Sequence, residues 1–355
     1  MGKKTRDFQL KREHRMMNSY EKVMCVLEGE KPDTSPVVPI ISDWCSIQAG
    51  IEFIDELESV EKHVYSQSFC VSQFGYDAVW DIGSRHSESE AMGSVLKISK
   101  GAKPYVVDYA VKDYDRDLPK LKLFDPYTNK RLATYLEQTR CLKRRFQGEV
   151  PVIGYVQAPF RHAAMLRGPE NIMRDMHRHK DHLKELCELA LNSLIVYAVA
   201  VISAGADIVF MSDPTSSGSA ISKKQWEQWG FPYLKRLVGL IKRSGVKTVL
   251  HICGNTEDRL ESMADTGVDC LSLDEAVDFE KARKILGPSY CLMGNINTSL
   301  MAIGNPKSVE EATKEVIAKA GKYGHLLVSG GCGLSANVPP ENMSAMVKAA
   351  GEVTL

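Results

Sequence analysis

The chain has 355 residues, of which 44% are hydrophobic and 25% charged, a composition typical of a globular protein with one large domain or two ordinary ones. Its 45 basic and 45 acidic residues balance, so charge gives no reason to expect binding to nucleic acid or to an anionic membrane. We find no apolar run approaching 18 residues, no signal-peptide core near the N-terminus and no disulfide framework among the nine scattered cysteines. These features predict a cytoplasmic protein without nucleic-acid or membrane partners.

The N-terminal part of the chain predicts an arm, a helix and a strand. Residues 1–17 are polar and basic, and we expect a solvated arm there. Residues 18–28 are amphipathic with a period typical of a helix, and Gly29 and Pro32 end it. The apolar run Val37–Ile41 predicts the first strand, and helical periodicity follows over Phe53–Phe74.

Seven further strands and several helices alternate in the rest of the chain. The strands are expected at Asp77–Ile82, Val152–Val156, Ala206–Met211, Lys247–Ile252, Val268–Leu273, Tyr290–Met293 and His325–Val328. The helices are expected at Asn171–Ser203, Lys223–Arg243, Thr256–Thr266, Phe279–Leu286, Val309–Gly321 and Pro340–Gly351. Continuous apolar strands are typical of parallel sheets that are covered on both faces.

This alternation predicts an α/β fold, namely a single (β/α)8 TIM barrel over residues 18–355 with an N-terminal helical extension. The stretch Arg85–Glu149 is too long for one strand–helix unit. It predicts an insertion of loops, or a small hairpin, over the mouth of the barrel. We see no linker that would separate two domains.

Two of the predicted strands end in metal-binding residue types. His251 and Cys253 alternate at the end of one apolar run, so both side chains point to the same side of a strand. Cys332 follows another apolar run and lies between glycines. A lone His-x-Cys, or a lone buried cysteine, is more often a packing feature. Their matched placement predicts a site with three nitrogen and sulfur ligands, the set that a catalytic zinc with an open fourth position requires.

Other polar residues follow predicted strand ends, which is where such barrels place their chemistry. Asp213 and Asp274 are candidate catalytic residues, as partners of His251, as a fourth ligand or as proton carriers, with helix capping as the alternative. The candidate substrate-binding residues, for which packing in the core or in a loop is the alternative, are Trp44, Tyr155, Gln157 and Asn295.

Several segments together resemble the uroporphyrinogen decarboxylase superfamily, and most closely its zinc-dependent methylcobamide methyltransferase branch. They are His251-Ile-Cys-Gly254, Cys332-Gly-Leu334, Gly205–Pro214, Gly294-Asn295, Gln157-Ala-Pro-Phe160 and Ser87–Gly93. The resemblance implies zinc held by His251, Cys253 and Cys332. It also implies methyl transfer between a small zinc-bound substrate and the cobalt of a corrinoid that a separate protein carries.

The decarboxylases of this superfamily bind their tetrapyrrole through an arginine-rich motif after the first strand. The corresponding stretch here, residues 40–50, contains neither arginine nor lysine. Two further alternatives are a cobalamin-independent methionine-synthase-like enzyme and a non-enzymatic metal- or corrinoid-binding module. The first would have an aspartate where Gly331 stands, and the second would not need an open zinc surrounded by carboxylates.

The two remaining hypotheses share every motif and differ only in the substrate pocket. One is an O-demethylase methyltransferase that takes a methyl group from a donor such as a phenyl methyl ether, and the other is a methylcobamide:coenzyme M (thiol) methyltransferase. Trp44 favours an aromatic or other apolar donor. A sulfonate requires a cation, and the nearest one, Arg161, lies a few residues past a strand end. We therefore expect the O-demethylase, with the thiol methyltransferase and the decarboxylase as alternatives.

Overall fold

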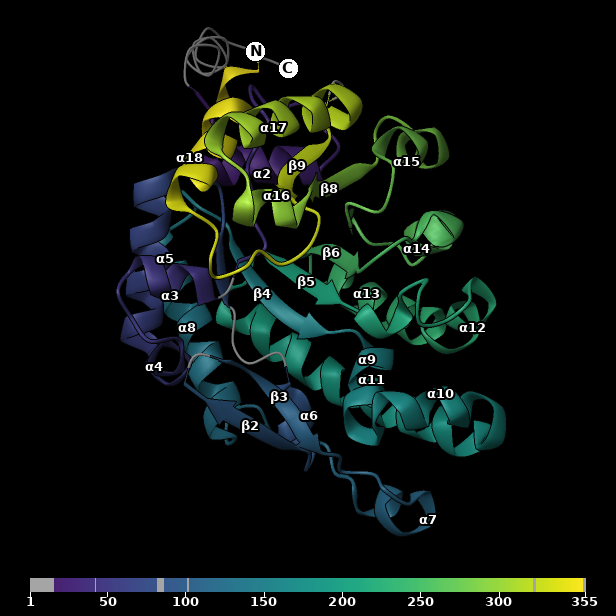
Figure 1. The fold of residues 1–355 in the computed structure, drawn as a ribbon. Coiled ribbons are helices and arrows are strands. Elements are labelled where there is room, and N and C mark those ends of the chain that lie inside the picture. The colour runs from purple at the N-terminus through teal and green to yellow at the C-terminus, as the bar shows by residue number, and fades with distance from the viewer. Residues whose placement is uncertain (1–15, 42, 82–85, 101, 322–323, 354–355) are drawn as a thin grey trace, which may run out of the picture.

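A computed structural model of the chain describes residues 16–41, 43–81, 86–100, 102–321 and 324–353. Its main feature is a parallel sheet of seven strands in the order β1-β4-β5-β6-β7-β8-β9. The strands are β1 (Val79–Asp81), β4 (Val152–Gln157), β5 (Ile208–Ser212), β6 (Lys247–Ile252), β7 (Cys270–Leu273), β8 (Cys291–Ile296) and β9 (Leu326–Gly330). These seven match seven of the eight predicted strands, with ends that differ by at most three residues. The sheet curls, and helices lie around its outer side (Figure 1).

The predicted first strand, Val37–Ile41, does not form a ladder. It makes one parallel bridge, from Val37 to Val328 of β9, and the Val38 N–H donates to the Val328 carbonyl at 2.8 Å. On its other side the N–H of Asp77, just before β1, donates to the Val37 carbonyl at 2.7 Å. The segment therefore contacts both edges of the curled sheet. The prediction of a regular strand is wrong because Pro36 and Pro39 have no N–H to donate to a ladder.

The helices pack mainly on the outer face of the sheet. The α-helices are α2 (Ser19–Leu27), α3 (Asp43–Gln48), α4 (Phe53–Glu58), α5 (Val60–Phe74), α6 (Ser87–Ala91), α7 (Tyr114–Asp117), α8 (Lys130–Phe146), α9 (Pro159–Arg167), α10 (Pro169–Arg178), α11 (Lys180–Ala204), α12 (Lys223–Trp229), α13 (Phe231–Arg243), α14 (Leu260–Ala264), α15 (Phe279–Leu286), α16 (Thr298–Ile303), α17 (Pro306–Ala320) and α18 (Pro340–Glu352). Short 3-10 turns lie at Leu118–Lys120, Pro214–Ser216 and Glu257–Arg259. Of the α-helices, α8, α11, α13 and α17 are among those that contact strands of the sheet directly.

The N-terminal helix of the extension is present as expected. Asn18 caps α2, its side chain accepting from the Glu21 N–H while the Glu21 carboxylate accepts from the Asn18 N–H. One cluster of buried apolar side chains extends from Val23 in α2 to Ala350 in α18, so the extension shares the core of the sheet. Residues 1–15 of the predicted arm, and Ser42, lie outside the described residues.

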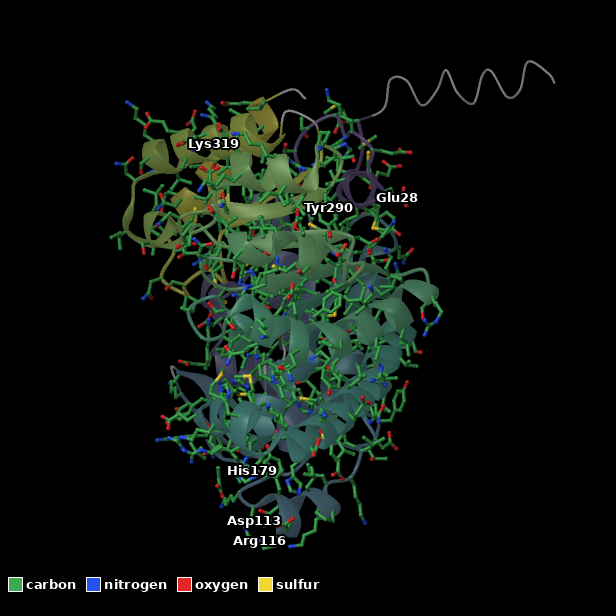
Figure 2. All side chains as sticks on the ribbon, turned by 90° about the vertical axis from the view of Figure 1, so that its right-hand side faces the viewer. Glu28, Asp113, Arg116, His179, Tyr290 and Lys319 are labelled. Atoms are coloured by element: carbon green, nitrogen blue, oxygen red, sulfur yellow. The ribbon has the colours of Figure 1, made fainter. Side chains whose placement is uncertain are left out.

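The predicted insertion contains a small hairpin, one of the two expected alternatives, formed by β2 (Val95–Ser99) and β3 (Ala102–Asp108). Glu88 in α6 accepts hydrogen bonds from the backbone and side chain of Gln157, so the insertion reaches the carboxyl end of β4. Beyond the hairpin the chain runs outward to α7, where Asp113 and Arg116 lie at the opposite end of the molecule from Lys319 (Figure 2). Helix α8 in this stretch was not predicted from the sequence. Residues 82–85 lie outside the described residues.

Among the described residues one helix, α11, is long and apolar enough by length and composition to cross a membrane, although we expected no such segment. It was predicted as part of a single helix over residues 171–203, but a break at His179 separates α10 from α11. In the most apolar 18-residue stretch of α11, 56% is buried inside the protein. There α11 packs against α8, α9, α13 and β4. The helix therefore belongs to the core, and the predicted cytoplasmic location stays a prediction.

Candidate metal centre

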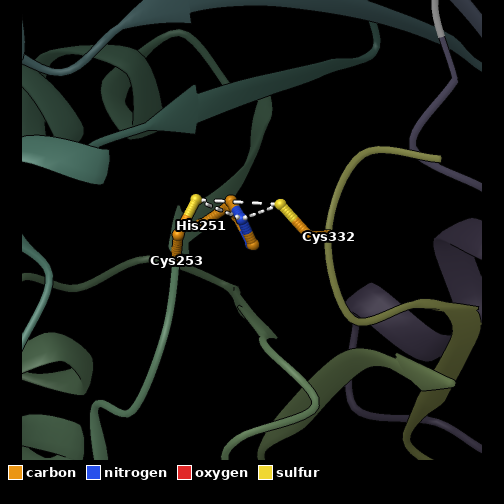
Figure 3. A group of neighbouring side chains, drawn as sticks. All are labelled: His251, Cys253 and Cys332. Carbon is orange, nitrogen blue, oxygen red and sulfur yellow. Dashed lines mark hydrogen bonds between the residues drawn. The ribbon is translucent and has the colours of Figure 1, made fainter. Parts of the chain in front are cut away.

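The carboxyl ends of β6 and β9 bring the three predicted zinc ligands together. His251 lies in β6, Cys253 directly after it, and Cys332 two residues after β9. The His251 Nε2 is 3.2 Å from the Cys253 Sγ and 3.5 Å from the Cys332 Sγ, and the two sulfurs are 3.7 Å apart (Figure 3). Because β6 and β9 are separated by two strands in the sheet, the curl of the sheet makes this meeting possible.

These separations are the ones that zinc would impose. A tetrahedral zinc with Zn–S about 2.3 Å and Zn–N about 2.05 Å holds two sulfurs about 3.8 Å apart and a sulfur about 3.5 Å from a nitrogen. The three side chains also form the one group of His, Cys, Asp and Glu residues in the described parts of the chain whose ligand atoms are close enough to share an ion. The donor set and its geometry therefore fit a zinc ion with an open fourth position.

Two glycines allow the loops to turn at the ligands. Gly254, directly after Cys253, has φ +74°, and its N–H donates to Asp274 Oδ2 at 2.9 Å. Gly331, directly before Cys332, lies so close to Glu275 that any side chain would overlap both the carboxylate and the backbone nitrogen of that residue. The glycine breaks noted in the sequence thus serve to place both cysteines.

The second ring nitrogen of His251 is held by β7. Nδ1 lies 3.2 Å from both the carbonyl and the hydroxyl oxygen of Ser272, which leaves Nε2 directed at the two sulfurs. An oxygen that accepts a hydrogen bond from Nδ1 fixes the tautomer in which Nε2 can bind a metal. Ser272 was not predicted from the sequence, which suggested Asp213 or Asp274 for this position.

A hydrogen bond between the two cysteines shifts their pKa values in opposite directions. The hydrogen bond with Cys332, followed by burial, raises the pKa of the Cys253 thiol. The same hydrogen bond, donated by Cys253, lowers the pKa of Cys332 well below its ordinary value, and His251 adds to the effect. One thiolate is therefore favoured by the protein itself, and thiolate is the form that binds metal.

The two candidate catalytic aspartates lie near the ligands in different settings. Asp213 is fully buried after β5. One oxygen accepts from the Ser216 hydroxyl at 2.5 Å, and the other, Oδ1, has no hydrogen-bond partner among the described residues. Burial raises the pKa of Asp213 to about 6. Asp274 instead accepts from the backbone N–H groups of Gly254 and Ala276, as a loop cap does.

Three of the candidate substrate-binding residues have partners within the protein. Trp44 is fully buried in α3, packs on Phe74 and donates from its indole to the Val338 carbonyl at 2.8 Å. Gln157 is fully buried and donates to Glu88, and Asn295 donates to the carbonyl groups of Asp274 and Val277. Substrate contacts by these residues stay predictions.

The fourth candidate, Tyr155, lies at the centre of a group next to the metal ligands. Its ring stacks on Phe210, which in turn stacks on His251. Its hydroxyl accepts a hydrogen bond from Arg161 in α9. Arg161 was noted in the sequence only as a cation past a strand end, because nothing in the sequence shows that the side chain turns back over the sheet.

Comparison with known proteins identifies the family. The family described as Uroporphyrinogen decarboxylase (URO-D) matches residues 18–353. The chain belongs to this family. It is 31% identical over 278 residues to the methylcobamide:CoM methyltransferase MtbA of Methanosarcina mazei, a match that covers 78% of this chain and 80% of that protein. The resemblance seen in the sequence is thereby confirmed.

Two further similar proteins are a decarboxylase and a methyltransferase of known structure. The uroporphyrinogen decarboxylase of Chlorobaculum parvum is 26% identical over 348 residues, covering 91% of this chain and 95% of its own. A solved methyltransferase structure from Methanosarcina mazei has the same fold, with a TM-score of 0.87 at 24% identity, and covers 95% of this chain and 99% of its own.

Proposed function

We propose that this protein is a zinc-dependent methyltransferase that moves a methyl group between a small thiol and the cobalt of a corrinoid held by a separate protein. The observation that carries the proposal is the meeting of His251, Cys253 and Cys332 with separations of 3.2 to 3.7 Å. The similarity to a methylcobamide:CoM methyltransferase at 31% identity supports it.

This proposal differs from the O-demethylase that the sequence favoured. That interpretation rested on Trp44 as an aromatic residue that would favour an aromatic or other apolar donor. It also rested on the lack of a cation at the strand ends. The indole of Trp44 is instead fully buried against Phe74, and Arg161 lies over the strand ends beside the site. The first observation removes the support for an aromatic donor, and the second favours a thiol that carries an acid group, such as coenzyme M.

The protein's residues would have separate tasks. His251, Cys253 and Cys332 would hold zinc, which supplies a Lewis acid that keeps a thiol deprotonated at neutral pH. Ser272 orients His251 through Nδ1, and Asp274 fixes the backbone after Cys253. We assign to Asp213, with its unpartnered Oδ1 among the described residues, the uptake of the proton that the thiol releases.

The proposal extends to the architecture. We propose a (β/α)8 barrel in which the extended segment 37–41 occupies the place of the first strand, between β9 and β1. The hydrogen bonds of this segment to both edges of the sheet support that arrangement. Residues 18–355 would then form one domain, as the shared core cluster also favours.

The direct test is methyl transfer from free methylcobalamin to coenzyme M by the purified, zinc-replete protein. We expect the methylcobalamin absorbance to fall only when the thiol is present. This fall should not occur with the Cys332→Ser variant. Parallel assays would follow cob(I)alamin methylation by a phenyl methyl ether and carbon dioxide release from uroporphyrinogen. Activity in either of these, without thiol methylation, would overturn the proposal in favour of the corresponding alternative.

A further inference from the structure

Arg161 is a buried cation without an ion pair among the described residues. Only 6% of it is exposed, and none of the salt bridges between described residues includes it. Its Nη1 donates to the hydroxyls of Tyr155 and Ser212, the latter at 3.2 Å, while Nε is buried without a partner among the described residues. A buried charge is unfavourable unless a counter-charge or enough hydrogen bonds offset its loss of hydration.

Buried arginines elsewhere in the chain are used differently. Arg259 is 1% exposed, and its Nη1, Nη2 and Nε donate to the carbonyls of Ser216 and Ile221 and to the carboxylate of Asp258. In Arg161 only Nη1 is engaged. The side-on face formed by Nε and Nη2, which matches the two oxygens of an oxyanion, has no hydrogen-bond partner among the described residues.

The acidic groups closest to Arg161 are committed to other partners. Burial raises the pKa of both Glu88 and Asp213, and the charge of Arg161 opposes this effect, so both carboxylates lie within its electrostatic range. Glu88, however, accepts from the backbone and side chain of Gln157, and Asp213 accepts from Ser216. Neither carboxylate occupies the free face of the guanidinium.

The position of Arg161 connects it to the metal ligands. Tyr155 and Ser212, which hold its Nη1, lie on β4 and β5. Ser212 is the register partner of His251 on the next strand, and the ring of Phe210 lies between Tyr155 and His251, 6.3 Å from one and 6.1 Å from the other. Arg161 is thus held at the same strand ends that carry the metal ligands.

We propose that Arg161 binds the acid group of the substrate, a sulfonate or a carboxylate, while the substrate's sulfur lies at His251, Cys253 and Cys332. The hydroxyls of Tyr155 and Ser212 hold the guanidinium in position and leave Nε and Nη2 for two oxygens of the anion. This assignment rests on the proposed function and adds to it the determinant of substrate class, a short thiol with a terminal acid. A neutral thiol of the same length leaves the buried charge unpaired and is therefore a poorer substrate.

The kinetic test compares thiols that differ only in the acid group. Coenzyme M, 3-sulfanylpropanoate and 2-sulfanylethanol share a two-carbon chain and end in a sulfonate, a carboxylate and a neutral hydroxyl. We expect a wild-type kcat/KM that favours one of the two acids over the alcohol. Arg161→Gln should reduce this preference about 10- to 100-fold, as the loss of a hydrogen-bonded charge does, and Arg161→Lys should restore part of it.

A binding measurement separates this proposal from the proposed function. Calorimetric titration with ethanesulfonate and with propanoate, which lack the thiol, requires no methyl transfer. We expect one of the two to bind the wild type, and Arg161→Gln to weaken that binding about 10- to 100-fold. If no thiol is methylated but the anion binds in this way, the proposed function fails while the anion site stands.

Controls separate binding from folding. Arg167→Gln, in the same helix, removes an arginine that pairs with Asp175 at 2.7 Å, so it should lower stability without changing the preference between thiols. Tyr155→Phe removes the hydroxyl that holds Arg161 but keeps the charge of Arg161. It should reduce the preference for acid over neutral thiols several-fold. Equal loss of activity with acid and neutral thiols in Arg161→Gln, or wild-type protein that binds neither anion, would overturn the proposal.

Discussion

His162 in α9 should make the protein less stable in mild acid. The imidazole is fully buried between Ser89, at 3.0 Å from Nδ1, and Met92, at 3.2 Å from Nε2. Burial, with a smaller effect from Arg161, lowers the pKa of His162 to about 3. The unfolded chain, with a histidine pKa of about 6.5, binds the proton first as the pH falls. Stability contributed by His162 is therefore present above pH 6.5 and is lost progressively between about pH 6.5 and pH 3.

The two pKa values give the size of the effect. Between pH 7 and pH 5 the linkage relation yields a loss of about 2 kcal/mol in the free energy of unfolding. Asp213 acts in the opposite direction, because its raised pKa of about 6 lets the folded state take up a proton first. The informative quantity is therefore the difference between the wild type and a His162→Asn variant, in which Asn keeps a polar group near Ser89.

The assay is equilibrium urea unfolding of both proteins at pH 7 and at pH 5. The wild type should lose about 2 kcal/mol more than His162→Asn between the two pH values, whatever the variant's stability at pH 7. His177→Asn is the control, because the exposed His177 side chain meets water in both states. Equal pH dependence of the wild type and His162→Asn would refute the reasoning.

Three further predictions concern the metal centre and the sheet. Ser272→Ala should weaken zinc binding about 10-fold in a chelator competition, because His251 loses one of the two oxygens at Nδ1 and keeps the carbonyl. Gly154→Ala should cost about 1–3 kcal/mol in urea unfolding, because a methyl group at that position of β4 would overlap Val201 in α11. Removal of zinc by a chelator should lower the melting temperature, because an ion bound only by the folded state stabilises that state.

Each of these has a matched control and an outcome that contradicts it. Ser329→Ala changes another buried serine, whose hydroxyl has no partner among the described residues, and should leave zinc affinity unchanged. Gly351→Ala, with nothing within 4 Å of the added methyl, should be neutral or slightly stabilising in α18. Zinc affinity unaffected by Ser272→Ala, a Gly154→Ala protein as stable as the wild type, or an unchanged melting temperature after chelation would each contradict its prediction.

The metal ligands could be predicted because the relevant information is local. The spacing of His251 and Cys253 places both on one face of a strand, and apolar runs that end in glycines mark the strand ends. The placement of Cys332 beside these two ligands could be predicted only together with a curled parallel sheet. Such a sheet brings the carboxyl ends of its strands together. Seven of the eight expected strands are present, since continuous apolar runs are a strong signal for buried parallel strands.

What the sequence did not reveal depends on contacts between segments far apart in the chain. Ser272 supports His251 from the neighbouring strand, and no spacing rule connects the two. Arg161 follows a strand end by four residues, and only the turn into α9 brings its side chain back over β4 and β5. Trp44 follows the apolar run 37–41, but helix α3 turns its ring into the core against Phe74.

The measurement that tests the central claim most directly is the zinc content of the purified protein, prepared without chelator, beside two cysteine variants. We predict about one zinc per chain in the wild type, as a three-ligand site requires, and loss of zinc in Cys332→Ser. Cys141→Ser replaces a cysteine in α8 that is not part of the ligand group, and should keep the zinc. A wild-type protein without zinc, or zinc retained in full by Cys332→Ser, would contradict the account.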